Sequence, residues 1–362
     1  MSQRLTVRLA LVAATLSLGW YGCSTDSPDV TAPPPEFSLA GQQGLEQAMR
    51  VQERHTPALM ARADVVGTAV GLDAAGNPVV KVYLQRAGVP GLPTRLDGFR
   101  VSPEVVGPIR ALVQQGQDAN PRAPPCATPP CGGGGGSSVD PTARFDRPVP
   151  IGVSTGHPEI TAGTIGARVT NGANVYALSN NHVYANQNLA SIGDEALQPG
   201  TFDGGVPGAD AIGTLADFEP IVFSTSANNV IDAAIALSST GQLGNATPSD
   251  GYGTPSSATV AAVPGMRVMK YGRTTSLTKG RVDAVNAIVN VQYDDGVARF
   301  VQQVIVRGRF SAGGDSGSLI VVERGTDARK AVALLFAGGS GITVGNPIGA
   351  VLSRFGVTID GQ

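Results

Sequence analysis

The chain has 362 residues, which is more than one average domain and predicts two folded units or one unit with long extensions. Its formal net charge is −2 and it has no block of Lys or Arg, which excludes a general nucleic-acid-binding surface. Hydrophobic residues (42%) are ample for a core, while 48 glycines and 26 prolines favour short strands joined by tight turns.

The first 23 residues predict export. Arg4 and Arg8 precede an apolar stretch, residues 9–18, that is too short to span a bilayer and is typical of a signal-peptide core. Gly22-Cys23 resembles the bacterial lipoprotein box, whose cysteine is acylated, although Trp20 stands where that box prefers a branched aliphatic residue. Plain secretion, a periplasmic location and a lipid anchor at Cys23 therefore all stay open, and that anchor is the only membrane contact expected.

Residues 24–37 are rich in Ser, Thr, Asp and Pro and predict a disordered tether. Residues 38–114 predict a small α+β domain. It begins with a helix that ends before Thr56-Pro57, where a second helical turn starts. A β-hairpin with strands over 65–72 and 79–84 follows.

A linker is predicted over residues 115–146, because this stretch is rich in proline and contains five consecutive glycines, residues 132–136. It also holds Cys126 and Cys131, the only pair left once Cys23 is removed. In an oxidising compartment this pair predicts a small disulfide loop, which would stabilise the fold by ~2 kcal/mol. Two cysteines without a nearby histidine do not complete a zinc site.

Residues 147–362 predict an all-β domain with one C-terminal helix. The strand-like runs cover residues 175–178, 268–271, 287–293, 300–306, 319–322 and 331–336. Asp294-Asp295-Gly296 predicts a tight turn between two of them. At the end, Asn346 is expected as a helix N-cap and Pro347 as the first helical residue, before apolar residues at helical spacing: Ile348, Val351, Leu352 and Phe355.

Three short segments of this domain could carry chemistry. His182 ends a strand-like run, whereas the other two histidines, His55 and His157, are expected to be surface or structural residues. Asp232 lies in an apolar run, where a carboxylate either faces water at a strand end or is buried to hold an imidazole. Gly314-Asp315-Ser316-Gly317 is either a plain Gly/Ser turn or a bend that exposes a nucleophilic hydroxyl beside aligned amides.

Taken in the order His, Asp, Ser, these segments resemble the chymotrypsin-like serine protease superfamily, in particular its bacterial streptogrisin, α-lytic and HtrA-type members. The matching motifs are Ser179-Asn180-Asn181-His182-Val183, Asp232-Ala233-Ala234-Ile235-Ala236-Leu237, Gly314-Asp315-Ser316-Gly317 and Gly272-Arg273-Thr274-Thr275. An α/β-hydrolase would need the reverse order and a glycine at the position of Ser318, so that alternative fails.

The resemblance implies two six-stranded antiparallel Greek-key barrels with the site between them. It implies a serine endopeptidase acting on a protein or peptide substrate, with no metal or organic cofactor. Ser316 would attack the carbonyl, His182 would move the proton and Asp232 would orient His182. The backbone N–H groups of Gly314 and Ser316 would form the oxyanion hole.

Other family features carry over less directly. Phe310, six residues before the nucleophile, would line the specificity pocket. Its apolar side chain argues against a preference for Lys or Arg and favours a preference for a small or apolar residue. No Ile/Val-Val/Ile-Gly-Gly start lies near residue 148, so activation by a new N-terminus pairing with Asp315 is not expected. The domain at 38–114 is either a pro-region or an accessory domain. The rival function is a catalytically silent protease-fold module that binds proteins at the cell surface.

Overall fold

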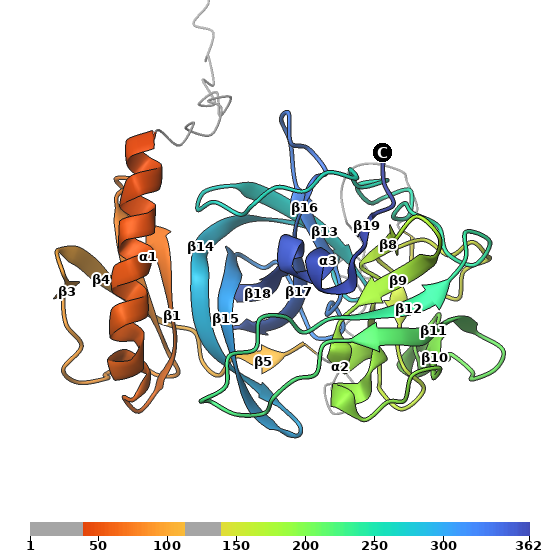
Figure 1. Cartoon of the computed structure of the whole chain (residues 1–362), viewed down its shortest axis with the longest axis horizontal. Coiled ribbons are helices and arrows are strands. Elements are labelled where there is room, and N and C mark those ends of the chain that lie inside the picture. The colour runs from red at the N-terminus through yellow and green to blue at the C-terminus, as the bar shows by residue number, and fades with distance from the viewer. Residues whose placement is uncertain (1–38, 113–138) are drawn as a thin grey trace, which may run out of the picture. The chain divides into compact units, whose positions relative to one another are not determined.

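The computed structural model describes residues 39–112 and 139–362, and these residues form one compact unit. The predicted signal peptide, the tether, Cys23 and the pair Cys126 and Cys131 lie outside the described residues. Two antiparallel β-sheet systems and a C-terminal helix make up residues 139–362, as the all-β prediction required (Figure 1).

The first barrel is built on a six-stranded sheet in the order β10-β11-β12-β9-β8-β19. Its strands are β8 (Ala167–Thr170), β9 (Val175–Ser179), β10 (Glu195–Leu197), β11 (Ala211–Phe218), β12 (Ala234–Ser238) and β19 (Thr358–Ile359). A small pair, β6 (Ser154–Thr155) and β7 (Gly163–Thr164), leads into β8, and a bridge from Gly156 to Leu197 links it to β10. Its interior is a cluster of small and branched apolar side chains, including Ile151, Ile212 and Leu215.

The second barrel closes on itself, because β13 pairs with both β14 and β16. Its strands are β13 (Arg267–Gly272), β14 (Ser276–Tyr293), β15 (Gly296–Arg307), β16 (Leu319–Val322), β17 (Ala331–Gly339) and β18 (Ile342–Pro347). All six predicted strand runs lie within observed strands of the two barrels, and Asp294-Asp295 turns β14 into β15 as expected.

The last helix, α3 (Ile348–Phe355), buries Ile348, Val351 and Leu352 in the apolar cluster shared by strands of both barrels. The expected N-cap is wrong. Pro347 is the N-cap, and the Asn346 side chain is hydrogen-bonded to the backbone of Asp232 instead.

The N-terminal segment contains α1 (Leu39–Met60), β1 (Val65–Leu72), β2 (Pro78–Leu84), β3 (Arg95–Leu96), β4 (Phe99–Val105) and β5 (Arg110–Ala111). The expected hairpin is β1–β2. The expected helix break is wrong, since α1 continues through Pro57 to Met60. A proline so near the helix end removes few backbone hydrogen bonds, and Thr56 Oγ1 donates to the Gln52 carbonyl (2.7 Å). Eight buried apolar residues give the segment a core of its own.

This segment shares a sheet with the second barrel. Strand β1 pairs antiparallel with β14, which extends the barrel to an eleven-stranded sheet. Beside this seam, buried Lys81 Nζ lies 2.9 Å from Glu104 Oε1 and 2.8 Å from Asp283 Oδ2. Arg307 Nε lies 3.2 Å from Asp283 Oδ1 and pairs with Glu104 as well. Residues 39–112 and the barrel are thus joined by backbone hydrogen bonds and by a charge network.

Residues 139–146, which fall within the predicted linker, pack on the barrels. Arg144 Nε donates to Asp210 Oδ1 (2.8 Å), and the backbone N–H of Val139 donates to Asp250 Oδ2 (3.0 Å). The hydrogen bond from Arg144 lowers the pKa of Asp210 below its ordinary value, although burial of the carboxylate acts in the opposite direction. The ordered barrel domain therefore includes residue 139.

Candidate active site

Strand pairing in the first barrel brings His182 and Asp232 together. Ser179, the last residue of β9, lies opposite Ala234, the first residue of β12. His182, in the short helix α2 (Asn181–Tyr184), and Asp232 therefore leave the sheet at the same end. His182 Nδ1 lies 2.5 Å from Asp232 Oδ2, and both side chains are fully buried.

Two asparagines hold the backbone of Asp232 by hydrogen bonds. Asn180 Nδ2 and Asn346 Nδ2 both donate to the Asp232 carbonyl (2.7 and 3.0 Å), and Asn346 Oδ1 accepts from the Asp232 N–H (3.1 Å). Asn180 belongs to the first barrel and Asn346 to the second, so the backbone of Asp232 is held by both barrels. This role could not be predicted from the sequence, because Asn before Pro also fits a helix start.

Tyr293 is a second residue at the site that sequence reasoning missed. Its Oη donates to Asp232 Oδ2 (2.8 Å), and its ring meets the His182 ring edge-on at 6.0 Å between centroids. Burial raises the pKa of Tyr293 well above its ordinary value, and the Asp232 charge raises it further. The hydroxyl therefore stays protonated and keeps donating to the carboxylate.

We expect Tyr293→Phe to lower kcat by about 10–100-fold with little change in KM, because a hydrogen bond to a charged group contributes about 1.5–3 kcal/mol. The ring packing on His182 is kept in this variant. Tyr252→Phe is the matched control, since Tyr252 is buried and its Oη has no hydrogen-bond partner among the described residues. Steady-state kinetics on both variants measure the difference, and equal effects would show that the Tyr293 hydroxyl has no positioning role.

Ser316 lies in the turn between β15 and β16. Gly314 and Gly317 on either side have φ of +92° and +95°, a left-handed conformation that favours glycine. A Cβ on Gly317 would also come 2.2 Å from the Thr164 carbonyl oxygen, so this turn packs against the first barrel. Val183, the residue after His182, lies near this turn as well. A Cβ on Gly163 would lie 2.5 Å from Val183 Cγ2 and 3.1 Å from the Ser316 carbonyl oxygen.

The serine hydroxyl and the imidazole are not hydrogen-bonded to one another in this structure. Ser316 Oγ donates to the Phe336 carbonyl (3.1 Å). His182 Nε2 is buried and has no hydrogen-bond partner among the described residues. Because the Asp232 carboxylate can only accept, the neutral ring carries its proton on Nδ1, which leaves Nε2 as a free acceptor.

Asp315 is held by the Gly-Arg-Thr-Thr segment and by a buried lysine. The N–H groups of Thr274 and Thr275 donate to Asp315 Oδ1 (2.9 and 3.1 Å), and Thr275 Oγ1 donates to Oδ2 (2.7 Å). Lys270 Nζ lies 3.3 Å from Asp315 Oδ2, and both are fully buried. Burial lowers the pKa of Lys270, while the Asp315 charge opposes this shift. Asp315 thus has an internal cation as its partner.

We expect Lys270→Met to destabilise the fold by about 3–5 kcal/mol, because it leaves the Asp315 carboxylate buried without a cation. Lys279→Met is the matched control: Lys279 is 60% exposed and pairs with Glu323, so its loss is expected to cost about 1 kcal/mol or less. Urea denaturation followed by circular dichroism measures both. A Lys270→Met midpoint equal to that of the control would show that the buried pair is not needed.

The end of the N-terminal segment pairs with strands of the second barrel and bonds to the turn that carries Ser316. Strand β5 lies between β17 and β14, antiparallel to the first and parallel to the second. The Leu112 N–H donates to the Phe336 carbonyl (3.0 Å), and the Leu112 carbonyl accepts from the Gly314 N–H (2.7 Å). The amide expected in the oxyanion hole therefore already binds a peptide carbonyl. No strand was predicted here, because β5 has only two residues and pairs entirely with distant ones.

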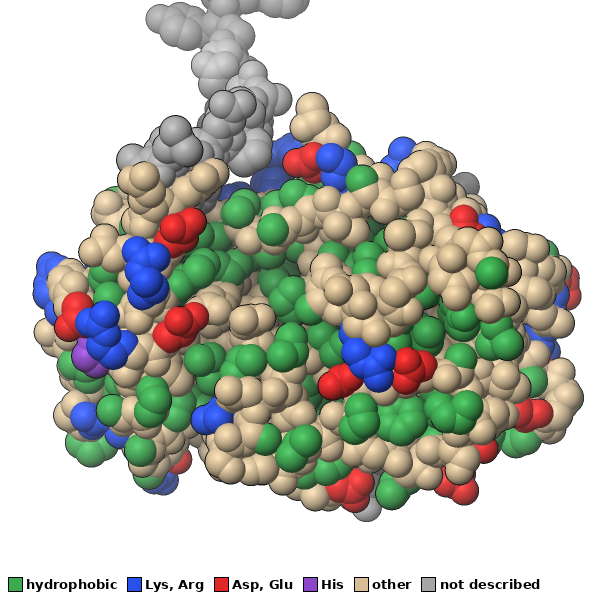
Figure 2. Space-filling view, in the orientation of Figure 1, with side chains coloured by type: hydrophobic (Ala, Val, Ile, Leu, Met, Phe, Trp, Pro, Cys, Tyr) green, Lys and Arg blue, Asp and Glu red, His purple; other side chains and the backbone are tan. Residues whose placement is uncertain are grey.

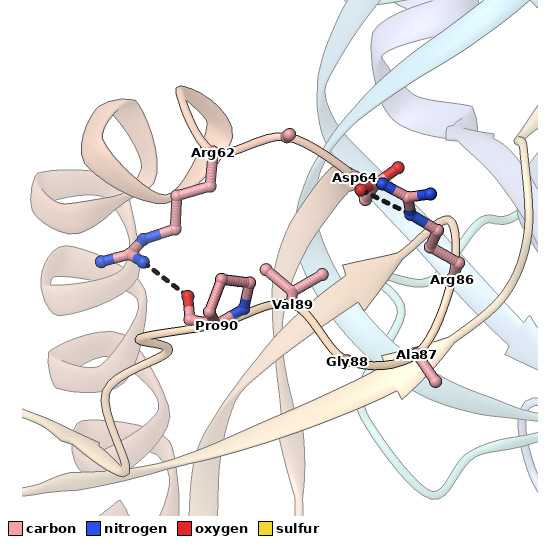
Figure 3. Close-up of a pocket in the computed structure, with 8 residues that line it drawn as sticks. Arg62, Asp64, Arg86, Ala87, Gly88, Val89 and Pro90 are labelled. Carbon is pink, nitrogen blue, oxygen red and sulfur yellow. Dashed lines mark hydrogen bonds and ion pairs between the residues drawn. The ribbon is translucent and has the colours of Figure 1, made fainter.

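Phe310, the expected pocket residue, is fully buried and belongs to the same hydrophobic cluster as Leu112. A surface depression lies between residues 62–64 and 86–90 (Figure 3). Its arginines are occupied, since Arg62 donates to the Pro90 carbonyl (3.0 Å) and Arg86 pairs with Asp64 (2.8 Å).

The remaining histidines are structural, as expected. His157 pairs with Asp194 (3.2 Å), and His55 pairs with Asp97 (3.0 Å). Within residues 39–112 and 139–362, no group of three His, Cys, Asp or Glu side chains could hold a metal ion, and no helix is long and apolar enough to cross a membrane. Lys/Arg and Asp/Glu side chains are interspersed on the face shown in Figure 2.

No protein-family model and no curated protein matches this chain. In structure it is similar to bacterial chymotrypsin-like serine proteases. A glutamic acid-specific serine protease matches with a TM-score of 0.43 and 24% identity, covering 58% of this chain and 100% of its own. Protease A of Thermobifida fusca matches with 0.43 and 18% (59% and 100% covered), and α-lytic protease homolog N4 with 0.42 and 20% (58% and 99% covered).

Proposed function

We propose that this protein is an exported serine endopeptidase that hydrolyses peptide bonds through an acyl-enzyme, with His182, Asp232 and Ser316 as its triad. The observation that carries the proposal is the hydrogen bond from the Gly314 N–H, two residues before Ser316, to a peptide carbonyl, that of Leu112. A buried His182–Asp232 pair, whose Nε2 has no hydrogen-bond partner among the described residues, supports it. Few arrangements other than acyl transfer use a carbonyl, an amide donor, a hydroxyl and an imidazole at one place.

Each group has a role in the proposed reaction. Turning about χ1 would release Ser316 Oγ from the Phe336 carbonyl toward His182 Nε2, which would take its proton as Oγ attacks the carbonyl carbon. Asp232 would hold the ring in this tautomer and stabilise the imidazolium. The Gly314 N–H would stabilise the oxyanion, and loss of one such donor in comparable sites costs about 10²–10³ in rate. Hydrogen bonds to a resting serine are often long or misaligned, which fits the unmade Nε2–Oγ bond.

We propose further that residues 39–112 are an inhibitory pro-region and not an accessory domain. The segment ends in the cleft, and its backbone takes the hydrogen bonds that a substrate strand would need from Phe336, Gly338 and Gly314. While it stays in place, the site is closed to other chains.

Incubation with a denatured, fluorescently labelled protein tests the proposed function. We expect cleavage that a serine-directed fluorophosphonate blocks and a metal chelator leaves unchanged. If the protein binds the substrate but cuts nothing at any stage of processing, the silent binding module is the correct alternative. If only the chelator blocks cleavage, the assignment of Ser316 as nucleophile is wrong.

A further inference from the structure

The four residues at the end of the N-terminal segment differ sharply in how they meet the cleft. Ile109 is 1% exposed and packs in the cluster that contains Phe300 and Phe336. Arg110 is exposed, and Ala111 is half-buried against the same cluster, which Tyr293 and Phe223 flank. Leu112 packs in a different cluster, with Phe310. The strand therefore presents two anchoring side chains, a small one between them, and one that points to solvent.

Backbone hydrogen bonds fix the register of these residues. The Gln292 N–H donates to the Ile109 carbonyl (2.9 Å), Arg110 and Ala111 lie opposite Gly338 and Ala337, and Leu112 bonds to Phe336 and Gly314. A one-residue slip would move every side chain to the opposite face. The side chain of Leu112 is thus the one that packs against the cluster with Phe310, next to the carbonyl that would be attacked.

The surroundings of Leu112 suit a medium aliphatic side chain. A Cβ on Gly338 would lie 3.3 Å from Leu112 Cδ1, so the leucine already packs closely against this glycine. The cluster that receives Leu112 is built of apolar side chains, among them Phe310, Val306 and Leu335. A lysine or a carboxylate entering it would lose its water without gaining a partner.

We infer that the cleft selects peptides with leucine, or a side chain of similar size and polarity, before the cleaved bond. Counting back from the cleaved bond, it takes a small residue at the second position, any residue at the third and a branched aliphatic residue at the fourth. The sequence Ile109-Arg110-Ala111-Leu112 is the protein's own copy of this recognition sequence. The inference rests on the proposed function, whose substrate class it names.

The inference also implies that the peptide bond after Leu112 is itself cleaved by this site. Ser316 Oγ would bond to the Leu112 carbonyl carbon and its proton would pass through His182 to the amine released from Val113 as the C–N bond breaks. Water would then add to the acyl carbon, the ester bond to Oγ would break, and Oγ would recover its proton. The products are a Leu112 carboxylate and a chain that begins at Val113.

Self-cleavage of the full chain tests this inference by intact mass. We expect the wild type to be cut after Leu112, Leu112→Met to be cut at a similar rate, and Leu112→Asp to be cut at least about 100-fold more slowly. Arg110→Glu is the matched control in the same strand, and it is expected to be cut like the wild type. Equal cutting of Leu112→Asp, or cutting of the wild type at another bond only, would overturn the inference.

Reaction with a fluorophosphonate separates this inference from the proposed function. Leu112→Asp should leave the cleft more readily, so its Ser316 is expected to be labelled although the chain stays uncut. If Ser316 is labelled but cleavage shows no preference for leucine over aspartate at position 112, only the specificity is wrong. If neither chain is labelled or cut, the proposed function fails and the specificity fails with it.

Discussion

Ser316→Ala is expected to lower the rate of peptide hydrolysis by about 10⁶-fold, because removal of the nucleophile from a triad that acts as a unit removes nearly all of its contribution. The fold should be unaffected, since Ser316 Oγ makes one hydrogen bond, to the Phe336 carbonyl. Losing that bond costs about 1 kcal/mol. Thermal melting of the variant should therefore stay within a few degrees of the wild type.

This comparison needs an open cleft, because a chain that cannot cut itself would also stay inhibited. Both proteins are therefore made in the Ile109→Asp background, in which a carboxylate replaces a buried anchor of β5 and should expel the strand. Ser318→Ala is the matched control, a buried serine two residues away whose Oγ donates to the Asp315 carbonyl (2.6 Å). Hydrolysis by Ser316→Ala at the rate of the Ser318→Ala control would refute the assigned nucleophile.

Asp232→Asn is expected to lower kcat by about 10⁴-fold, the loss found when this acid becomes an amide in comparable triads. The amide would turn its NH₂ toward His182 Nδ1, which favours the tautomer with the proton on Nε2. In that tautomer Nε2 cannot accept the proton of Ser316. Substrate binding should change little, because Asp232 is fully buried behind the imidazole.

Asp250→Asn is the control for this substitution. Asp250 also accepts a hydrogen bond from a tyrosine, from Tyr271 Oη at 2.9 Å, but it has no contact with His182. Its kcat is expected to stay within about threefold of the wild type, the spread usual for substitutions outside a site. A similar loss in both variants would mean that general destabilisation, and not the tautomer of His182, explains the effect.

The strands and the three candidate residues could be predicted because their signals are local. Each long strand is an apolar run, and Gly314 and Gly317 mark a turn whose backbone requires φ above zero. The register of β9 and β12 then brings His182 to Asp232 without further information. What the sequence could not specify was which hydroxyl, amide or lysine from other strands would complete the site.

The missed residues share one physical cause. Each of them bonds to a partner that is remote in sequence, and another acid or carbonyl could equally have been that partner. These residues are Tyr293, Asn346 and Lys270, and none lies in one of the matching family motifs. Strand β5 was missed because two residues of strand carry almost no periodic signal, and its pairing depends on β14 and β17 being present first. Non-local pairing also explains why the 39–112 segment, expected as a separate α+β domain, shares a sheet with the barrel.

The two charge networks connect different parts of the protein. Lys81, Glu104, Asp283 and Arg307 join the N-terminal segment to the barrel. Lys270 and Asp315 are internal to the barrel. Removal of the N-terminal segment would therefore expose Asp283 and Arg307 and free the Gly314 N–H, but it would leave the Lys270–Asp315 pair in place. The ion pair that holds Asp315, the residue next to Ser316, therefore does not depend on the N-terminal segment.

Labelling by a fluorophosphonate, located by peptide mass spectrometry, tests the account most directly. In the Ile109→Asp chain we predict one label per protein, on the peptide that contains Ser316. The uncut wild type should react at least about tenfold more slowly, in proportion to the fraction of time its cleft is open. A label on a different serine, or no label on either protein, would contradict the account.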